Sequence, residues 1–272
     1  LIRALAYTTH PYRWPTIGLE LAHIAQATLE DVKDFFYRFY APNNAILSIA
    51  GNISFDETIR LVEKWFGPIP RREVHPRMLP QEPKQTEIRR MTVERDVPLD
   101  TLYMAFHTCN RTHPDYYAVD MLSDLLANGS SSRLIEHLVK QKQIFSQIDA
   151  YITGSFDEGL LKITGKPLPG ISLEEAEAYI WQELETLCQT MPEERELEKV
   201  KNRYEAEQTI KSVNFLNNAV NMAYFELIGQ AEDVNDEVRN YHSVTPQDIQ
   251  RVANKVFKEE NSSVLYYKAV SQ

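Results

Sequence analysis

The sequence is poor in the residue types that point directly to a covalent framework or a metal centre. It has only two cysteines, Cys109 and Cys188, among 272 residues. Because they form neither a metal-spaced pair nor a disulfide framework, we interpret both as buried free thiols. The longest apolar runs fall well short of the roughly 18–20 residues of a membrane-spanning helix. We therefore expect no membrane span.

Basic residues are also too few for a nucleic-acid partner. The formal net charge is −10; residues 1–80 are about neutral, and the remainder holds 20 Lys/Arg against 31 Asp/Glu. Binding to phosphate backbones needs basic patches, so we expect no nucleic-acid binding. Hydrophobic residues make up 43% and charged residues 25% of the chain, which is typical of a globular protein with a sizeable core.

A signal peptide is missing too, but the chain begins with Leu1 rather than methionine. We expect that its natural start lies upstream, so this absence gives no information on the compartment.

The end of the chain repeats part of its beginning. The segment Thr28-Leu-Glu-Asp31-Val32 corresponds to Thr245-Pro-Gln-Asp248-Ile249 at an offset of 217 residues, and the match continues to Leu47 and Val264. Each copy predicts a capped helix, a short loop and a strand. The second copy closes a long unit, whereas the first lies near the start. We expect the front of the first unit to be missing and the chain to be the back part of a larger protein.

The remaining patterns predict an α+β fold with a mostly antiparallel sheet. Expected helices cover residues 28–40, 55–66, 114–127, 132–142, 172–190, 193–211, 214–229 and 245–257. Expected strands cover residues 45–50, 87–95, 100–107, 144–153, 159–165 and 262–268. Residues 1–20 are expected to form a connecting segment without regular structure. Five prolines between 68 and 83 predict a stiff linker.

Three motifs in order resemble the pitrilysin/insulinase-like zinc metallopeptidases, the inverzincins. They are His10-Pro-Tyr12 followed by Ile17-Gly18, then Phe39-Tyr-Ala-Pro-Asn-Asn44 followed by Ile49-Ala-Gly-Asn52, and finally the glycine-serine turn within Leu126–Leu134. The resemblance implies duplicated metallopeptidase-like α/β sandwich domains, of which the first is incomplete here. Residues 1–75 would be the remainder of the catalytic-type domain, 76–86 the linker, and 87–272 the complete substrate-enclosing domain.

The family holds zinc with an inverted H-x-x-E-H helix and a downstream glutamate, all of which precede the segment that matches His10–Tyr12. The seven histidines here include no H-x-x-x-H pair. The resemblance therefore implies zinc in the intact parent protein only. We assign no catalytic, cofactor-binding or metal-binding residue to this chain and expect it to be inactive alone.

Several residues come close to a metal site without forming one. Arg133-Leu-Ile-Glu136-His137 has the motif spacing, but arginine cannot ligate zinc, so we interpret it as a charged helix. The repeat equivalents of the zinc helix fall on Asp120, Ser123 and Asp124, which we interpret as a solvated helix face. We interpret His10 as a structural corner, and His107 with Cys109 as a packed strand end rather than half of a zinc site.

One further family feature is absent. Many second domains carry an arginine and a tyrosine seven residues apart that bind the substrate backbone near zinc. The alignment places Val139 and Ser146 there, and neither can replace a guanidinium or a phenol.

The resemblance implies part of a zinc-dependent metalloendopeptidase that cleaves peptides or unfolded polypeptides in a closed two-domain chamber. The alternative is an inactive homologue that acts as a scaffold or as a substrate-binding partner of an active subunit. A third reading, a stand-alone binding module, would leave a half-built sheet with an exposed edge. We expect residues 1–70 either to pack against another copy, in a homo- or hetero-dimer, or to be poorly ordered.

Overall fold

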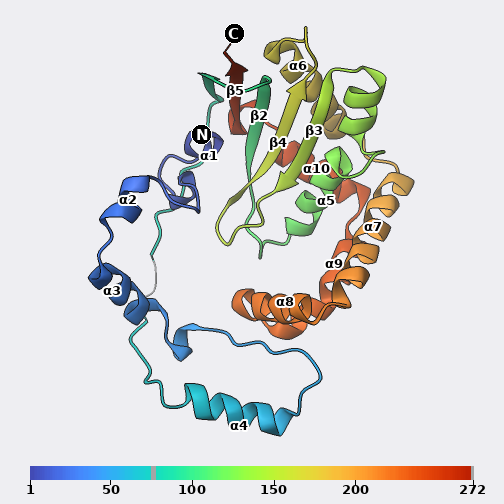
Figure 1. The fold of residues 1–272 in the computed structure, drawn as a ribbon. Helices are drawn as coiled ribbons and strands as arrows, with labels where there is room; N and C mark the ends of the chain where they lie inside the picture. Colours follow the sequence, from blue (N-terminus) through green and yellow to red (C-terminus); the bar gives the residue numbers. More distant parts are fainter. Residues whose placement is uncertain (75–77, 271–272) are drawn as a thin grey trace. The chain divides into compact units, whose positions relative to one another are not determined.

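A computed structural model describes residues 1–74 and 78–270, which divide into two compact units (Figure 1). Unit 1 comprises Leu1–Arg13, Pro80–Glu205 and Val238–Gln272, and unit 2 comprises Trp14–Leu79 and Ala206–Glu237. Positions 75–77 of the expected linker lie outside the described residues. None of the helices within the described ranges is long and apolar enough to cross a membrane.

Unit 1 is built on one five-stranded sheet with the order β1-β5-β2-β4-β3. The strands are β1 (Arg89–Arg95), β2 (Thr101–Thr108), β3 (Phe145–Ile152), β4 (Gly159–Pro167) and β5 (Ser262–Ala269). Only β1 and β5 run parallel, and the other neighbours are antiparallel. The prediction of an α+β fold with a mostly antiparallel sheet is confirmed.

One face of this sheet carries the hydrophobic core, because alternate side chains such as Leu102, Met104 and Phe106 point to it and are fully buried. Three helices, α5 (Tyr116–Ala127), α6 (Leu173–Gln189) and α10 (Pro246–Val256), lie on that face (Figure 1). The remaining helices of the region are the π-helix Ile135–Gln141, which occupies most of the expected helix 132–142, and α7 (Glu194–Ser212) and α9 (Glu237–Ser243).

Within the described part of unit 1, the first residues of the chain pack on the other face of the sheet. We expected residues 1–20 to be a connecting segment, but Ile2–Ala6 form a helix, α1, followed by a 3-10 turn at Pro11–Arg13. Ala6 and Tyr7 are buried against Ala105 and Leu160 of the sheet. The docking was not predicted because five residues are too few for a helical period to show in the sequence.

Four α-helices lie wholly within the described residues of unit 2: α2 (Leu21–Gln26), α3 (Leu29–Phe39), α4 (Phe55–Phe66) and α8 (Phe215–Ile228). Short 3-10 helices follow α3 at Pro42–Asn44 and α8 at Ala231–Asp236. The predicted strand at residues 45–50 does not form. A strand needs a neighbour to satisfy its backbone N–H and C=O groups, and no strand in the described ranges pairs with this segment.

The helical part of the internal repeat recurs down to single hydrogen bonds, whereas the strand forms in the second copy and not in the first. Helices α3 and α10 have the same length and begin and end at equivalent positions. Both open with a capping box, in which the threonine hydroxyl donates to the aspartate at 2.6 Å, Thr28 to Asp31 and Thr245 to Asp248. Beyond each helix the Nδ2 of an equivalent asparagine, Asn44 or Asn261, donates at 2.8 Å to the carbonyl of the last helical residue.

Candidate functional site

The repeat equivalents of the zinc helix lie on α5, and hydrogen bonds to neighbouring helices occupy them. The Tyr241 hydroxyl of α9 donates to Asp120 Oδ2 at 2.5 Å, and the Ser123 hydroxyl donates to the Asp120 carbonyl at 2.8 Å. Burial and the nearby Asp120 carboxylate raise the pKa of Tyr241 far above its usual value, so the phenol stays protonated and keeps donating.

The second aspartate of this set has its own partners. Asp124 accepts from Arg203 Nη2 of α7 at 3.0 Å and from Asn128 Nδ2 at 2.7 Å. Arg203 also donates to the Asn128 carbonyl. The Tyr241 phenol and the Arg203 guanidinium therefore bind the carboxylates of Asp120 and Asp124. These are the positions that correspond to the zinc helix of a catalytic domain. The geometry does not fit zinc, because both acids serve to join α5 to α7 and α9.

The segment Arg133–His137, which has the spacing of the zinc motif, also makes ion pairs. Arg133 Nε and Nη2 donate to both carboxylate oxygens of Glu196 at 2.9 and 2.8 Å. His137 Nδ1 lies 2.7 Å from Glu183 Oε2, and Glu136 pairs with Lys140 at 3.0 Å. Throughout residues 1–74 and 78–270, no three His, Cys, Asp or Glu side chains come close enough to share a metal ion.

His10 lies in a buried corner. Its side chain is almost fully enclosed, Nδ1 accepts from the backbone N–H of Tyr12 at 3.2 Å, and Nε2 lies 3.3 Å from Asp157 Oδ2. Its ring packs edge-on against Tyr12, with centroids 4.2 Å apart. These contacts tie the first segment of the chain to the loop between β3 and β4.

His107 and Cys109 line one pocket at the end of β2, together with His113, Glu82 and Glu158. His107 Nε2 lies 2.9 Å from the Ala6 carbonyl, and burial lowers the pKa of this imidazole. Burial raises the pKa of the Cys109 thiol, so it stays a poor nucleophile at neutral pH. The structure brings the two side chains together but gives them no third ligand in the described part of the chain.

The two positions that align with the family's substrate-binding arginine and tyrosine differ in burial. Val139 packs half-buried against the core, whereas Ser146 is exposed on β3 and donates to the Lys166 carbonyl at 3.1 Å. Neither position presents a guanidinium or a phenol.

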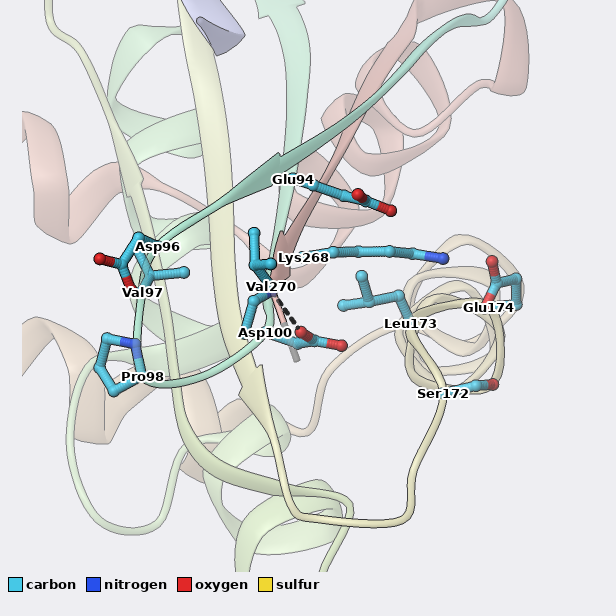
Figure 2. Close-up of a pocket in the computed structure, with 11 residues that line it drawn as sticks. Glu94, Asp96, Val97, Pro98, Asp100, Ser172, Leu173, Glu174, Lys268 and Val270 are labelled. Carbon is cyan, nitrogen blue, oxygen red and sulfur yellow. Dashed lines mark hydrogen bonds between the residues drawn. The ribbon is translucent and has the colours of Figure 1, made fainter. Parts of the chain in front are cut away.

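Sequence reasoning missed an acidic pocket at the ends of β1 and β5 (Figure 2). It lies where these parallel strands meet the start of α6, and its polar lining includes Glu94, Asp96, Glu174 and Lys268. Glu94 and Lys268 are opposite each other in the β1–β5 register. Asp100 Oδ1 accepts from the Ala269 N–H at 2.8 Å, which fixes the loop that closes one side.

It also missed the sheet face opposite the helices. Lys162 interrupts the apolar strand Leu160-Leu-Lys-Ile163 and is only 8% exposed. A lysine within such a strand was the one signal for this face that the sequence offered.

Residues 26–204 match the family described as the peptidase M16 inactive domain. The chain belongs to this family. The match agrees with the α5 geometry, in which the zinc-helix positions carry two aspartates bound to other side chains and a serine bound to a backbone carbonyl. It also confirms the family that the three motifs resemble.

Similar proteins carry the name zinc protease. Zinc protease PqqE of Helicobacter pylori is 29% identical over 268 residues, which cover 97% of this chain and 60% of that protein. Zinc protease YmxG of Bacillus subtilis is 23% identical over 269 residues, covering 97% and 64%. This chain thus spans a little under two thirds of the length of either relative.

Solved structures show the same fold. The crystal structure of a protease from Helicobacter pylori matches with a TM-score of 0.89 at 28% identity, over 98% of this chain and 65% of that one. The peptidase M16 inactive domain from Pseudomonas fluorescens matches with a TM-score of 0.84 at 18% identity, over 99% and 64%.

Proposed function

We propose that this chain is the non-catalytic part of a two-domain zinc metalloendopeptidase. Residues 87–272 form the substrate-enclosing domain, 76–86 the linker and 1–75 the remainder of the catalytic-type domain. The observation that supports this most directly is on α5, where Tyr241 and Arg203 bind Asp120 and Asp124. A domain that has converted its metal-site positions into structural contacts can enclose a substrate but cannot cleave it.

Because the residues of this chain do not fit zinc, the metal and the water that it activates belong to residues outside the chain. The contribution of unit 1 is a surface for the peptide. Strand β3 is an edge of the sheet, with Gln147, Asp149 and Tyr151 exposed along it. An extended peptide adds to such an edge through backbone hydrogen bonds, which select unfolded segments over folded ones.

A second function is an inactive subunit that binds substrate or supports an active partner. The side chains at Val139 and Ser146 favour it, because neither can hold a substrate backbone near zinc as an arginine and a tyrosine would. The two functions differ in whether zinc is bound within the same polypeptide.

The test compares the whole protein that contains this chain with the chain alone. Zinc is measured by mass spectrometry, and cleavage is measured with an internally quenched peptide. We expect about one zinc per molecule and cleavage for the whole protein, and neither for the chain. The matched control is the double change Asp120→Asn and Asp124→Asn in the whole protein, which should leave the zinc content unchanged.

Two outcomes would change the proposal. A whole protein without zinc would leave the family membership intact and favour the inactive-subunit function. A zinc content that falls with the double change would overturn the structural role assigned to Asp120 and Asp124.

A further inference from the structure

Among the described residues of unit 1, those that pack on the sheet face opposite the helices cover only part of it. Helix α1 and Tyr7 bury Ala105 and Leu160 at one end. Lys162 lies beside them, opposite Ala105 on β2 and opposite Tyr151 on β3 in the strand register. Tyr151 is 45% exposed. The face therefore changes at Lys162 from a covered apolar region to an open aromatic one.

Lys162 is a buried cation without a carboxylate. Its side chain is more than nine-tenths buried, and its ammonium lies 5.6 Å from the centre of the Tyr151 ring. Within the described residues it makes no ion pair. Asp149 is on the same face, opposite Thr164, and does not reach it.

A second positive charge, that of Arg3, acts on Lys162. Arg3 of α1 is half-buried and also has no ion-pair partner among the residues that the structure describes. Burial and the charge of Arg3 together lower the pKa of Lys162 to about 8. The positive charge of Arg3 thus makes it harder for the buried Lys162 ammonium to stay charged.

Two arginines of unit 1, Arg90 and Arg133, are each paired with a carboxylate. Arg90 donates to both oxygens of Glu177 at 2.7 and 2.8 Å, and Arg133 does the same with Glu196. Burying a charge is costly unless a counter-charge and hydrogen bonds compensate it. The pair of Arg3 and Lys162 lacks this compensation, and an anion from outside the chain would supply it.

We propose that Lys162 and Arg3 bind a carboxylate group of a peptide, with the ring of Tyr151 beside the bound residue. The inference deepens the proposed function and rests on it for the choice of a peptide as ligand. An ammonium and a guanidinium each supply charged donors that a carboxylate oxygen can accept from. Tyr103 and Tyr267, whose ring centroids are 6.2 Å apart, extend the aromatic surface along which neighbouring apolar side chains can lie.

A peptide carboxylate fits better than a polyanion. The whole chain carries a net charge of −10, which repels nucleic acids and polyphosphates. A single carboxylate on an otherwise apolar peptide avoids most of this repulsion and gains the aromatic contacts. The carboxylate can come from the C-terminus of a peptide or from an Asp or Glu side chain.

The test measures peptide binding to this 272-residue chain by calorimetry, without zinc and without cleavage. Three versions of one apolar hexapeptide separate the sources: a free C-terminus, an amidated C-terminus, and an amidated C-terminus with one internal glutamate. Inorganic phosphate is the fourth ligand. We expect binding only by the peptides that carry a carboxylate, and whichever of the two binds more tightly identifies the source.

The variants are Lys162→Met and the matched control Lys166→Met, which removes a lysine four residues further on the same face of β4. We expect Lys162→Met to weaken binding by roughly tenfold to a hundredfold, the value of one charge-assisted hydrogen bond. Lys166→Met should leave it unchanged. Equal binding of all three peptides, tighter binding of phosphate, or equal effects of the two variants would each overturn the proposal.

A second readout does not depend on how the variant folds. The pKa of the Lys162 ammonium, followed by NMR of the unmodified chain, should rise from about 8 towards its ordinary range when the carboxylate peptide is added, because a bound anion stabilises the charged form. An unchanged pKa at saturating peptide would contradict the inference. Neither readout involves zinc. The proposed peptidase role can therefore fail while the carboxylate site stands, and the carboxylate site can fail while the peptidase role stands.

Discussion

Helices α3 and α10 are copies of one another with the same backbone and opposite surroundings. Both have a capping box at the start and an asparagine that binds the last helical carbonyl beyond the end. In α10, Ile249 and Val252 are fully buried against α5, α6 and the sheet. Their equivalents in α3, Val32 and Phe35, are 58% and 57% exposed.

The comparison separates the structure that a segment forms by itself from the structure that forms only when neighbouring segments pack or pair with it. A helix satisfies its own backbone hydrogen bonds, so α3 forms without a covering layer. A strand does not, so residues 262–269 become β5 between β1 and β2, whereas residues 45–50 stay irregular in the described structure. The apolar face of α3 is the part of the first copy that lacks the packing found in the second.

The largest difference in stability should come from truncating the equivalent apolar side chain in each helix, one variant at a time. Ile249→Ala removes a side chain that is fully buried, and such a truncation costs about 2–5 kcal/mol of unfolding free energy. Val32→Ala at the equivalent position should change stability by less than about 0.5 kcal/mol. The measurement is urea unfolding followed by the fluorescence of Trp181, which packs on Phe106 in unit 1.

The control removes the other two tryptophans with Trp14→Phe and Trp65→Phe, which leaves Trp181 as the single reporter. Equal losses at positions 32 and 249 would show that α3 is packed as tightly as α10, and the comparison would fail.

Local signals predicted most of the fold. The helices at 172–190, 193–211 and 214–229 were expected within about two residues of α6, α7 and α8. Two of them begin directly after a capping residue, Ser172 or Asn214, which is a local start signal. The five strands that the structure describes in unit 1 were also expected from the sequence. The motifs around His10, Phe39 and Gly129 were enough to indicate the family that the match at residues 26–204 shows.

Contacts between distant segments could not be predicted in this way. The docking of Ala6 on Ala105 depends on a pairing about a hundred residues apart, and no local pattern encodes it. The partners of Asp120 and Asp124 are similar cases, because Tyr241 and Arg203 come from α9 and α7. The unpaired state of Lys162 is visible only once every neighbouring side chain has been placed.

The caps offer a smaller test of the same comparison. Thr245→Ala removes the hydroxyl that accepts from the Asp248 N–H at 3.2 Å, and losing such a cap costs about 1 kcal/mol. Because α10 is packed into the core, the loss should appear in the unfolding of unit 1. Thr28→Ala removes the equivalent cap of α3 and should leave that unfolding curve unchanged.

The effect of Thr28→Ala should instead be confined to the amide protons of α3. A helix of this length is marginal without tertiary packing, so we expect faster amide exchange within α3 and none of this change in α10. Thr245→Ala should lower the urea midpoint while Thr245→Ser, which keeps a hydroxyl, should restore it. A Thr28→Ala variant that lowers the Trp181 midpoint as much as Thr245→Ala would contradict the independence of the two copies.

The smallest effect concerns Glu82, which holds the first residues of the chain to unit 1. Its carboxylate accepts from the backbone N–H groups of Thr8, Thr9 and His10 at 2.7, 2.8 and 2.8 Å. Burial alone would raise the pKa of Glu82, but these hydrogen bonds outweigh it and lower the pKa from 4.5 to about 2. A depressed pKa contributes stability at pH values above 4.5 that is lost as the pH falls towards 2.

Glu82→Gln should therefore release this segment at neutral pH and remove its pH dependence between 4.5 and 2. Since the carboxylate is partly exposed, we expect a loss of only about 1 kcal/mol, which is roughly a fivefold decrease in amide protection at Thr8–His10. Glu87→Gln, a nearby exposed change, is the control. If protection at Thr8–His10 stayed the same in Glu82→Gln, the packing of Tyr7 on the sheet, rather than the carboxylate, would hold the segment in place.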